Sequence, residues 1–260
     1  MERALWSAVS GMKAQELSLD SISNNLANIN TTSFKASRIN FQDMLYSAIS
    51  TPGATSGEGE IPAGIQVGHG TRVSGIAKQF QQGSLIQTGA NLDLAIEGEG
   101  MFEVTLPDGS RAYTRDGSFK LSSTGEVVTS DGYKLVGFDS IDEGTTEITI
   151  APDGALSTVV NGTAVTKSKI SLVRFINPQG LRAIGRNLYQ PTLSSGDAQT
   201  GLNPGENGVG TLAQRNLEAS NVSAAEELVS MITTQRAYEA TSKAIQTSDE
   251  MMGIANALNR

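Results

Sequence analysis

Apolar residues recur at helical spacing near the N-terminus, within a segment that is otherwise rich in asparagine, serine and threonine. The a positions of this heptad pattern are Leu5, Met12, Leu19 and Leu26, and the positions three residues later are Ala8, Gln15, Ile22 and Ile29. The spacing predicts an amphipathic helix with one narrow apolar stripe, here called the N-terminal seam, in which Gln15 is the polar gap.

A second heptad pattern, here called the C-terminal seam, lies near the other end of the chain. Its first row is Leu217, Ala224, Met231, Tyr238, Ile245 and Met252, and its companion row is Leu228, Gln235, Ser242 and Asp249. The companion row is mostly polar, so this seam is weaker than the first. Ser223 followed by Glu226 forms a capping box, which predicts that the C-terminal helix begins at Ala224.

Between the two ends the apolar period changes from helical to alternating. In "NLDLAIEGEGMFEVTL" one face carries Leu92, Leu94, Ile96, Phe102, Val104 and Leu106, with the segment 97–100 as a break. Asp-Gly pairs begin at Asp108, Asp116, Asp131 and Asp153, and Asn161-Gly162 follows. Because glycine tolerates positive φ, each pair suits a tight hairpin. We therefore expect an antiparallel β domain from about Ser74 to Pro191.

These patterns predict an α+β fold with five segments. The N-terminal helical segment covers residues 1–40, and the C-terminal helical segment covers residues 211–260. We expect these two segments to pair as a coiled-coil-like inner domain. An extended arm spans residues 41–73, of which Tyr46–Arg72 is rich in glycine and proline and has no clear period. The central, mainly antiparallel β domain spans 74–191, and a return linker spans 192–210.

Composition narrows the class of function. The net charge of −8 and the pI near 4.8 argue against nucleic-acid binding, because phosphate neutralisation needs clustered lysine and arginine. The chain has no cysteine, which excludes disulfides, thiolate catalysis and cysteine metal sites. No apolar run approaches the roughly 20 residues that span a bilayer. Residues 1–10 lack the pattern of a cleavable signal peptide.

The N-terminal seam is too narrow to offset the backbone entropy of ordering about 30 residues against a single partner helix. Other copies of the chain are the obvious source of further neighbours, although an intramolecular helix pair that closes a β domain remains the simpler alternative. The candidate self-assembly residues are Leu5, Met12, Leu19, Ile22, Leu26, Ile29, Leu228, Met231, Tyr238, Ile245 and Met252.

Four ordered blocks carry a resemblance to a known family. The block "SNNLANINTTSFKA" resembles the N-terminal signature of the flagellar rod and hook proteins, the axial subunits of the bacterial flagellum. Their C-terminal helix is similar to "LEASNVSAAEELVSMITTQRAYEATSKAIQTSDEMM", and their shared β core is similar to "LDLAIEGEGMFEV" and "YTRDGSFKLSSTGEVVTSDGYKL". Within the family, the length and the stretch Tyr46–Val73 resemble the distal rod more closely than the longer hook protein. Ser33 departs from the pattern, since glycine usually precedes Phe34-Lys35 and permits a positive-φ turn.

The resemblance implies a structural subunit with no catalytic, cofactor or metal site. Such subunits leave through the flagellar type III export channel without a cleaved signal peptide and polymerise into a hollow helical tube in the periplasm. Their terminal helices form the inner wall, and the tube transmits torque from motor to hook. The implied partners are further copies of the chain, the adjoining proximal rod and hook proteins, and the surrounding rod-ring proteins. Neither nucleic acid nor a small-molecule substrate is implied.

Two other readings remain open from the residues. One is a proximal rod or hook subunit of the same family. The other is a secreted glycoside hydrolase that uses carboxylates among Asp93, Glu97, Glu99 and Glu103, although charges alternating with apolar residues are typical of the solvated face of a strand pair. His69, the only histidine, lies between two glycines and is more simply a loop residue.

Overall fold

The computed structural model describes residues 2–50, 55–56, 59–60, 64–142, 145–160 and 163–258. The chain divides into two compact units. The helical unit contains Met1–Ala27, Ser37–Lys78 and Ser223–Arg260, and the β unit contains Asn28–Ala36 and Gln79–Val222. Each unit is therefore assembled from segments that are distant in the sequence.

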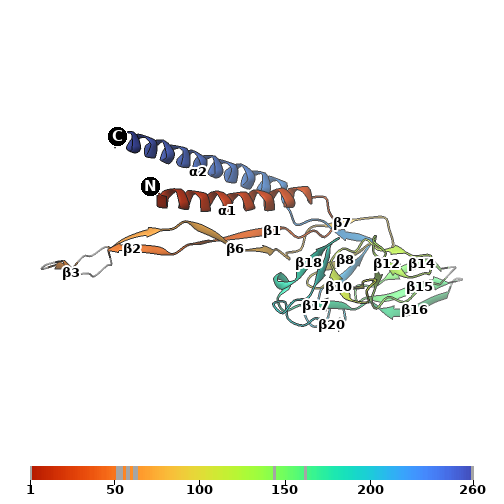
Figure 1. Cartoon of the computed structure of the whole chain (residues 1–260). Helices are drawn as coiled ribbons and strands as arrows, with labels where there is room; N and C mark the ends of the chain where they lie inside the picture. Colours follow the sequence, from red (N-terminus) through yellow and green to blue (C-terminus); the bar gives the residue numbers. More distant parts are fainter. Residues whose placement is uncertain are drawn as a thin grey trace. The chain divides into compact units, whose positions relative to one another are not determined.

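Two long helices dominate the helical unit. Helix α1 spans Glu2–Ala27 and helix α2 spans Ala224–Leu258. They contact each other and run antiparallel (Figure 1). The predicted helices at both chain ends are thus confirmed, as is the start of the second at Ala224. The first ends earlier than the seam predicted, because a turn over 28–30 follows Ala27 and leaves Ile29 outside the helix.

The rest of the helical unit is an antiparallel ribbon of two chain segments. Its strands are β1 (Ser37–Asp43), β2 (Tyr46–Ser50), β3 (Thr55–Ser56), β4 (Gly59–Glu60), β5 (Ile65–Gly68) and β6 (Thr71–Lys78). They pair as β1 with β6, β2 with β5 and β3 with β4. The stretch Tyr46–Arg72, which has no clear period in the sequence, is therefore largely strand where the structure describes it.

The β unit contains one sheet of seven strands. In spatial order its strands are β11 (Lys120–Leu121), β12 (Val127–Val128), β13 (Lys134–Leu135), β9 (Phe102–Thr105), β10 (Arg111–Thr114), β19 (Leu188–Gln190) and β18 (Arg182–Gly185). A separate sheet of three strands has the order β14 (Thr145–Ile150), β15 (Ala155–Val160) and β16 (Thr163–Lys169).

Three strand pairs complete the β unit. They are β17 (Leu172–Arg174) with β20 (Gln199–Leu202), β8 (Leu94–Glu97) with β21 (Thr211–Gln214), and β7 (Leu85–Gln87) with β22 (Asn216–Glu218). A short 3₁₀ helix, η1, spans Pro178–Gly180. The strand pairings of the described residues are antiparallel, so the predicted combination of terminal helices and a mainly antiparallel middle is confirmed.

Residues 199–202, 211–214 and 216–218 are strands, whereas the sequence patterns placed them in a linker and in the C-terminal helical segment. Leu217 consequently lies in β22 and opposite Ile86, not on a helix. Leu217 is in a strand because its segment pairs with β7, which is distant in the sequence. A heptad pattern contains no information about such a partner. The expected start of the β domain, Ser74, lies inside β6 and therefore in the helical unit. Neither described helix is both long and apolar enough to cross a membrane.

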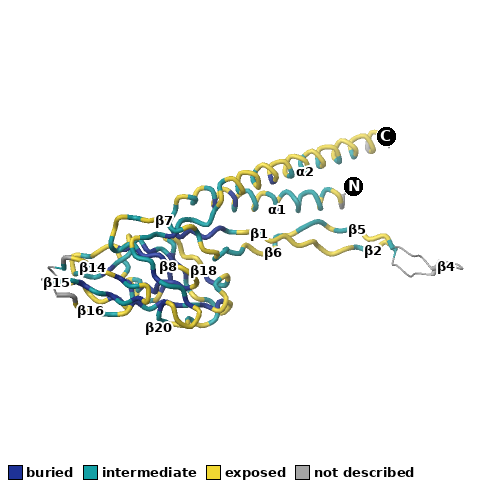
Figure 2. Tube along the Cα trace, turned by 180° about the vertical axis from the view of Figure 1, so that it is seen from behind, coloured by how far each residue is buried: buried dark blue, intermediate teal, exposed yellow. Residues whose placement is uncertain are grey.

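The core of the β unit uses the alternating apolar face predicted from the sequence. Leu94, Ile96, Phe102 and Val104 are fully buried, and Leu92 and Leu106 pack against them. Figure 2 shows the buried positions concentrated in the strands of this unit, while α2 is largely exposed. The β unit therefore has a core of its own, whereas α2 offers much of its surface to solvent.

The Asp-Gly pairs form hairpin turns at three of the predicted places. Gly109, Gly132 and Gly154 have positive φ and connect β9 with β10, β12 with β13, and β14 with β15. The pair at Asp116 is an exception, because β10 and β11 are not neighbours in the sheet. There a Cβ on Gly117 would lie 1.6 Å from the carbonyl oxygen of Leu94, so glycine permits a close approach and not a turn. The Asn161-Gly162 turn lies outside the described residues.

Candidate assembly surface

The interface between α1 and α2 buries part of the predicted N-terminal seam. Ile22 is 7% exposed, and Leu5, Met12, Leu19 and Leu26 are half-buried. Small residues fill the remaining space, since Ala14 is buried and a Cβ on Gly11 would meet Thr241 at 3.9 Å. Close packing of two helices therefore uses small residues as well as the seam.

The face of α2 turned toward α1 differs from the predicted one in its second row. Met231, Ile245 and Met252 are half-buried, as the first row predicts, while Tyr238 is 40% exposed. The other less exposed row is Glu227, Thr234, Thr241 and Ser248, which lies one residue earlier than the predicted companion row. Leu228 is consequently exposed. The predicted companion row was wrong because the positions that face α1 are polar or small. Apolar periodicity therefore does not identify them.

Asn25 joins three elements of the helical unit. Its Nδ2 donates to the carbonyl oxygen of Ser37 at 2.9 Å and to Oε1 of Glu227 at 2.9 Å. Its Oδ1 accepts from the backbone N–H of Ser37 at 2.9 Å. The amide thus holds the end of α1, the start of β1 and the first turn of α2 together, and Asn25 is buried there. A polar residue in a polar segment gave no sequence signal for this role.

Helix α1 also packs on the ribbon through small residues. The backbone N–H of Thr71 donates to Oγ of Ser10 at 3.2 Å. Gly70 has φ +106°, and a Cβ there would lie 3.1 Å from the Cα of Ser7. Only glycine fits both constraints.

Helix α2 carries apolar residues on the side opposite α1. With 3.6 residues per turn, these residues share one side of the helix: Leu228, Val229, Ile232, Met251, Ile254 and Leu258. All six are exposed, and Ile232 is 57% exposed. The charged residues Arg236, Glu239 and Lys243 separate them into two patches. On α1, Trp6 is 74% exposed.

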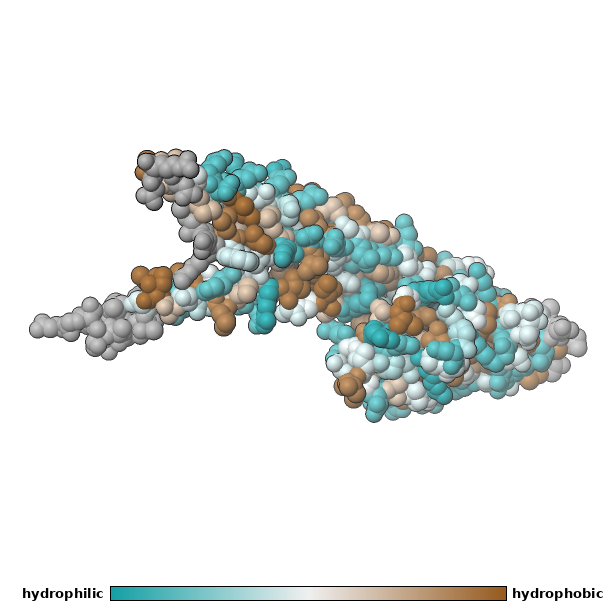
Figure 3. Space-filling view, viewed as in Figure 1, coloured by the Kyte–Doolittle hydropathy of each residue, from teal (hydrophilic) through white to brown (hydrophobic). Residues whose placement is uncertain are grey.

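The ribbon is also apolar on its surface. Its exposed apolar side chains are Phe41, Met44, Leu45, Tyr46, Ile49, Ile65 and Ile76. Figure 3 shows hydrophobic side chains gathered on the surfaces of the helices and of the ribbon. Exposed apolar patches of this kind mark interaction sites in soluble proteins.

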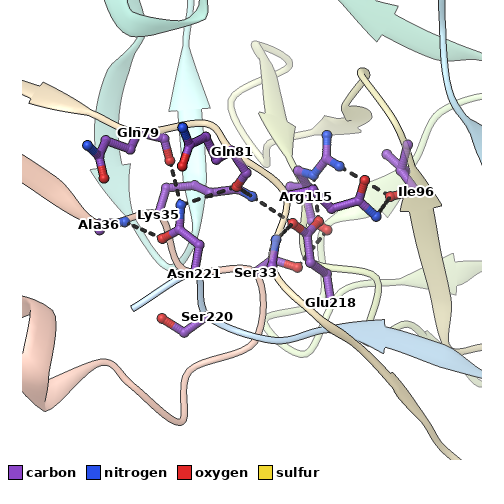
Figure 4. A network of polar contacts seen from close by, with 12 residues as sticks. Ser33, Lys35, Ala36, Gln79, Gln81, Ile96, Arg115, Glu218, Ser220 and Asn221 are labelled. Carbon is purple, nitrogen blue, oxygen red and sulfur yellow. Dashed lines mark hydrogen bonds and ion pairs between the residues drawn. The ribbon is translucent and has the colours of Figure 1, made fainter. Parts of the chain in front are cut away.

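The β unit contains a buried network of charges (Figure 4). Lys35 donates from Nζ to Oε1 of Glu218 at 2.6 Å, and Arg115 donates from Nε to Oε2 of Glu218 at 2.5 Å. The side chains of Lys35 and Glu218 are 0% exposed, and that of Arg115 is 5% exposed. Arg115 also donates to the carbonyl oxygens of Ile96, Gly98 and Gly100.

Two further residues hold this network in place. Ser33 has φ +55°, so the left-handed turn that glycine would favour is present with serine. Its Oγ donates to the carbonyl oxygen of Arg115 at 2.8 Å, and its backbone N–H donates to that of Glu218. Asn221 donates from Nδ2 to the carbonyl oxygens of Gln79 and Gln81 and accepts from the N–H of Ala36.

Burial also changes the titration of this region. Desolvation lowers the pKa of Lys35 below its ordinary value, although Glu218 acts in the opposite direction. Desolvation, with the charge of Glu218 adding to it, raises the pKa of Tyr189 to about 12. Both shifts follow from the cost of a charge in a dry environment.

The acidic residues considered for catalysis lie in different surroundings. Glu103 is buried and bonded to Arg111, so it does not lie on a solvated face as the alternation predicted. Asp93 accepts from Thr88, while Glu97 and Glu99 are exposed. His69 contacts the carbonyl oxygen of Leu45 at 2.9 Å. Within the described ranges, no group of three acidic or histidine side chains is arranged to hold a metal ion.

Comparisons with known proteins agree with the resemblance. Residues 5–35 match the family described as flagella basal body rod protein. Residues 95–158 match the flagellar hook protein FlgE/F/G D1 domain, and residues 213–258 match the flagellar basal body rod FlgEFG protein C-terminal family.

Relatives match over the whole length. The flagellar basal-body rod protein FlgG of Borreliella burgdorferi is 48% identical over 265 residues, which cover 100% of both chains. FlgG of Caulobacter vibrioides is 44% identical over 96% of this chain and 97% of its own, and FlgG of Bacillus subtilis is 40% identical over 97% of each. The chain therefore belongs to the flagellar basal-body rod protein family.

Within this family the predicted likeness to the distal rod protein is confirmed, because these relatives carry the FlgG name. The chain is a structural subunit of the flagellar basal body and not an enzyme. Neither the proximal rod or hook subunit nor the glycoside hydrolase is favoured by these relatives.

Proposed function

We propose that copies of this chain polymerise into the distal rod, a hollow helical tube that transmits torque from the motor to the hook. The observation that carries the proposal is the second apolar side of α2. One side of the helix meets α1, while Leu228, Val229 and Ile232 on the opposite side are exposed. Contacts that repeat from copy to copy without closing generate a helical filament.

In this proposal the paired helices form the inner wall as a coiled-coil-like layer. The residues at its contacts are the predicted self-assembly residues of the two helices, Leu5, Met12, Leu19, Ile22, Leu26, Leu228, Met231, Tyr238, Ile245 and Met252. The predicted Ile29 follows the end of α1 and is not one of them. Leu228 is exposed and available to another copy, whereas Ile22 already serves the contact between the two helices. Torque then passes through many small interfaces in parallel.

The ribbon is the proposed arm that lies along adjacent subunits. Its exposed residues Leu45, Tyr46 and Ile49 give it an apolar surface that a neighbouring copy would cover. An arm held by neighbours along the tube would stiffen the rod where a hook has to bend.

The proposed surroundings follow from the family. The ends of the rod adjoin the proximal rod and hook proteins, and the rod-ring proteins surround it. The subunit occupies the periplasmic part of the basal body and reaches it by type III export without a cleaved signal peptide.

Substitution on the outer side of α2 tests polymerisation. We expect Ile232→Asp to leave a folded subunit, because Ile232 is already exposed, and to abolish filament formation, because the charge would be desolvated between copies. Filaments can be observed by electron microscopy and sedimentation of the purified chain, and rods by isolation of basal bodies from complemented cells.

The matched control is Gln235→Asp, which adds the same charge to α2 at an exposed position that is already polar. It should polymerise normally. If Ile232→Asp formed filaments as readily as Gln235→Asp, the outer side of α2 would not be an assembly surface.

A further inference from the structure

The buried network of the β unit holds two cations and one carboxylate. Lys35 and Arg115 both bond to Glu218, and both also donate to backbone carbonyl oxygens, Lys35 to that of Gln81 and Arg115 to that of Gly100. Carbonyl dipoles do not replace the charge that Glu218 supplies. A buried charge that loses its partner is strongly destabilising.

The three charges come from distant parts of the chain. Glu218 lies 183 residues after Lys35 and 103 residues after Arg115. Lys35 belongs to the short N-terminal piece of the unit, and Arg115 directly follows β10 in the seven-stranded sheet. The single anion is therefore the last of the three to appear along the sequence.

The strand segment around Glu218 also closes the unit physically. Strands β21 and β22 pair with β8 and β7, and Leu212 of β21 is buried in the core. The backbone N–H of Gly83 donates to Oε1 of Glu218 at 2.8 Å. A Cβ on Gly83 would lie 2.2 Å from the carbonyl oxygen of Ala219. The end of β22 therefore lies directly against β7 and the residues just before it.

We infer that Glu218 is the closing residue of the β unit: the unit cannot bury Lys35 and Arg115 until β21 and β22 bring in the carboxylate. Until then a closed unit would hold both cations in a dry site without the carboxylate that they share. Folding of the unit thus waits for the segment 211–218, although most of its strands precede that segment.

This device is independent of polymerisation and goes beyond the proposed function. When a chain emerges from a channel N-terminus first, its β unit stays open until Glu218 has emerged as well. The N-terminal piece 28–36 and the late segment then become ordered together.

Refolding of the full chain tests the order of events. The chain is diluted from denaturant at low concentration, and pulses of hydrogen exchange are read by mass spectrometry. We expect peptides from 94–97, 102–105 and 111–114 to gain full protection in the same kinetic phase as 211–218. Full protection of 94–97 and 102–114 while 211–218 still exchanges would overturn the inference.

Two variants test whether charge is the cause. Glu218→Gln should slow the shared phase at least tenfold or prevent it, whereas the control Glu147→Gln, at an exposed position of β14, should leave it unchanged. The triple variant Lys35→Met, Arg115→Met, Glu218→Leu contains no buried charge at this place. In it, 102–114 should become protected before 211–218.

The outcomes of the triple variant separate charge from geometry. If 102–114 and 211–218 still gained protection together, or if 102–114 gained none, compensation of charge would not be what delays the unit. An unchanged rate in Glu218→Gln would lead to the same conclusion.

Discussion

At the residue scale, Ser33 shows how a departure from the family pattern is accommodated. Its φ of +55° is uncommon for a residue with a side chain. The hydroxyl that comes with this side chain bonds the carbonyl oxygen of Arg115 inside the buried network. The positive φ destabilises serine relative to glycine, but the serine hydroxyl gives a buried carbonyl oxygen a hydrogen bond that glycine could not make.

Tyr189 gives a prediction about alkaline stability. Its pKa in the folded chain is about 12, compared with 10.0 for an ordinary tyrosine, and the residue is buried. The folded state therefore keeps a proton that the unfolded state loses, and this stabilisation is present below pH 10 and lost between pH 10 and 12. Over that range Tyr189→Phe should reduce the fall in unfolding free energy by about 3 kcal/mol.

Denaturant unfolding followed at pH 9, 10, 11 and 12 measures this difference. Tyr46→Phe, at an exposed position of β2, is the control and should follow the parent chain. If Tyr189→Phe lost as much unfolding free energy between pH 10 and 12 as the parent chain, ionisation of Tyr189 would not be the cause of the loss.

At the element scale, the two helices are fixed by a few polar contacts in addition to apolar burial. Asn25 is the junction of α1, β1 and α2, and it supplies both a donor and an acceptor to Ser37. The amide group suits this position because a carboxylate could not donate to the carbonyl oxygen of Ser37 or to Glu227.

Replacement of Asn25 should therefore loosen the helical unit. Asn25→Asp loses both donated bonds and places a second carboxylate next to Glu227, so we expect a loss of about 2 to 4 kcal/mol in that unit at pH 7. The loss should shrink below about pH 4, where the carboxylates are protonated. Hydrogen exchange of α1 and the start of α2 provides the measurement.

Ser23→Asp adds the same charge at an exposed position of α1 and is the matched control. Equal exchange in the two variants would mean that Asn25 has no special part in joining the helices.

At the scale of the whole molecule, the β unit takes its strands from residues 79–222 and its first piece from residues 28–36. Helix α2 follows this unit in the sequence and adds no strand to it. The chain can therefore lose α2 without losing any part of the β core, but it cannot lose β21 and β22.

Two truncations check this division. A chain that ends at Val222 should keep slow hydrogen exchange in strands β8 to β10, whereas a chain that ends at Gly210 should lose it, because Leu212 and Glu218 are removed. If both chains kept their protection, the last two strands would not be essential to the unit.

The elements that could be predicted from the amino-acid sequence are those whose signal is local. Period 3.6 predicted the terminal helices, Ser223 and Glu226 predicted the start of α2, and period 2 with Asp-Gly pairs predicted much of the β core. These features depend on a residue and its near neighbours, so they can be read without a partner.

Which polar residues are buried depends on the folded arrangement of the chain. Lys35, Arg115, Glu218 and Asn25 look like surface residues in the sequence, yet each is satisfied by partners that are distant along the chain. The same holds for the inward row of α2 and for strands β21 and β22. A polar group can be buried only where a specific partner compensates it, and the partner is known only once the chain has folded.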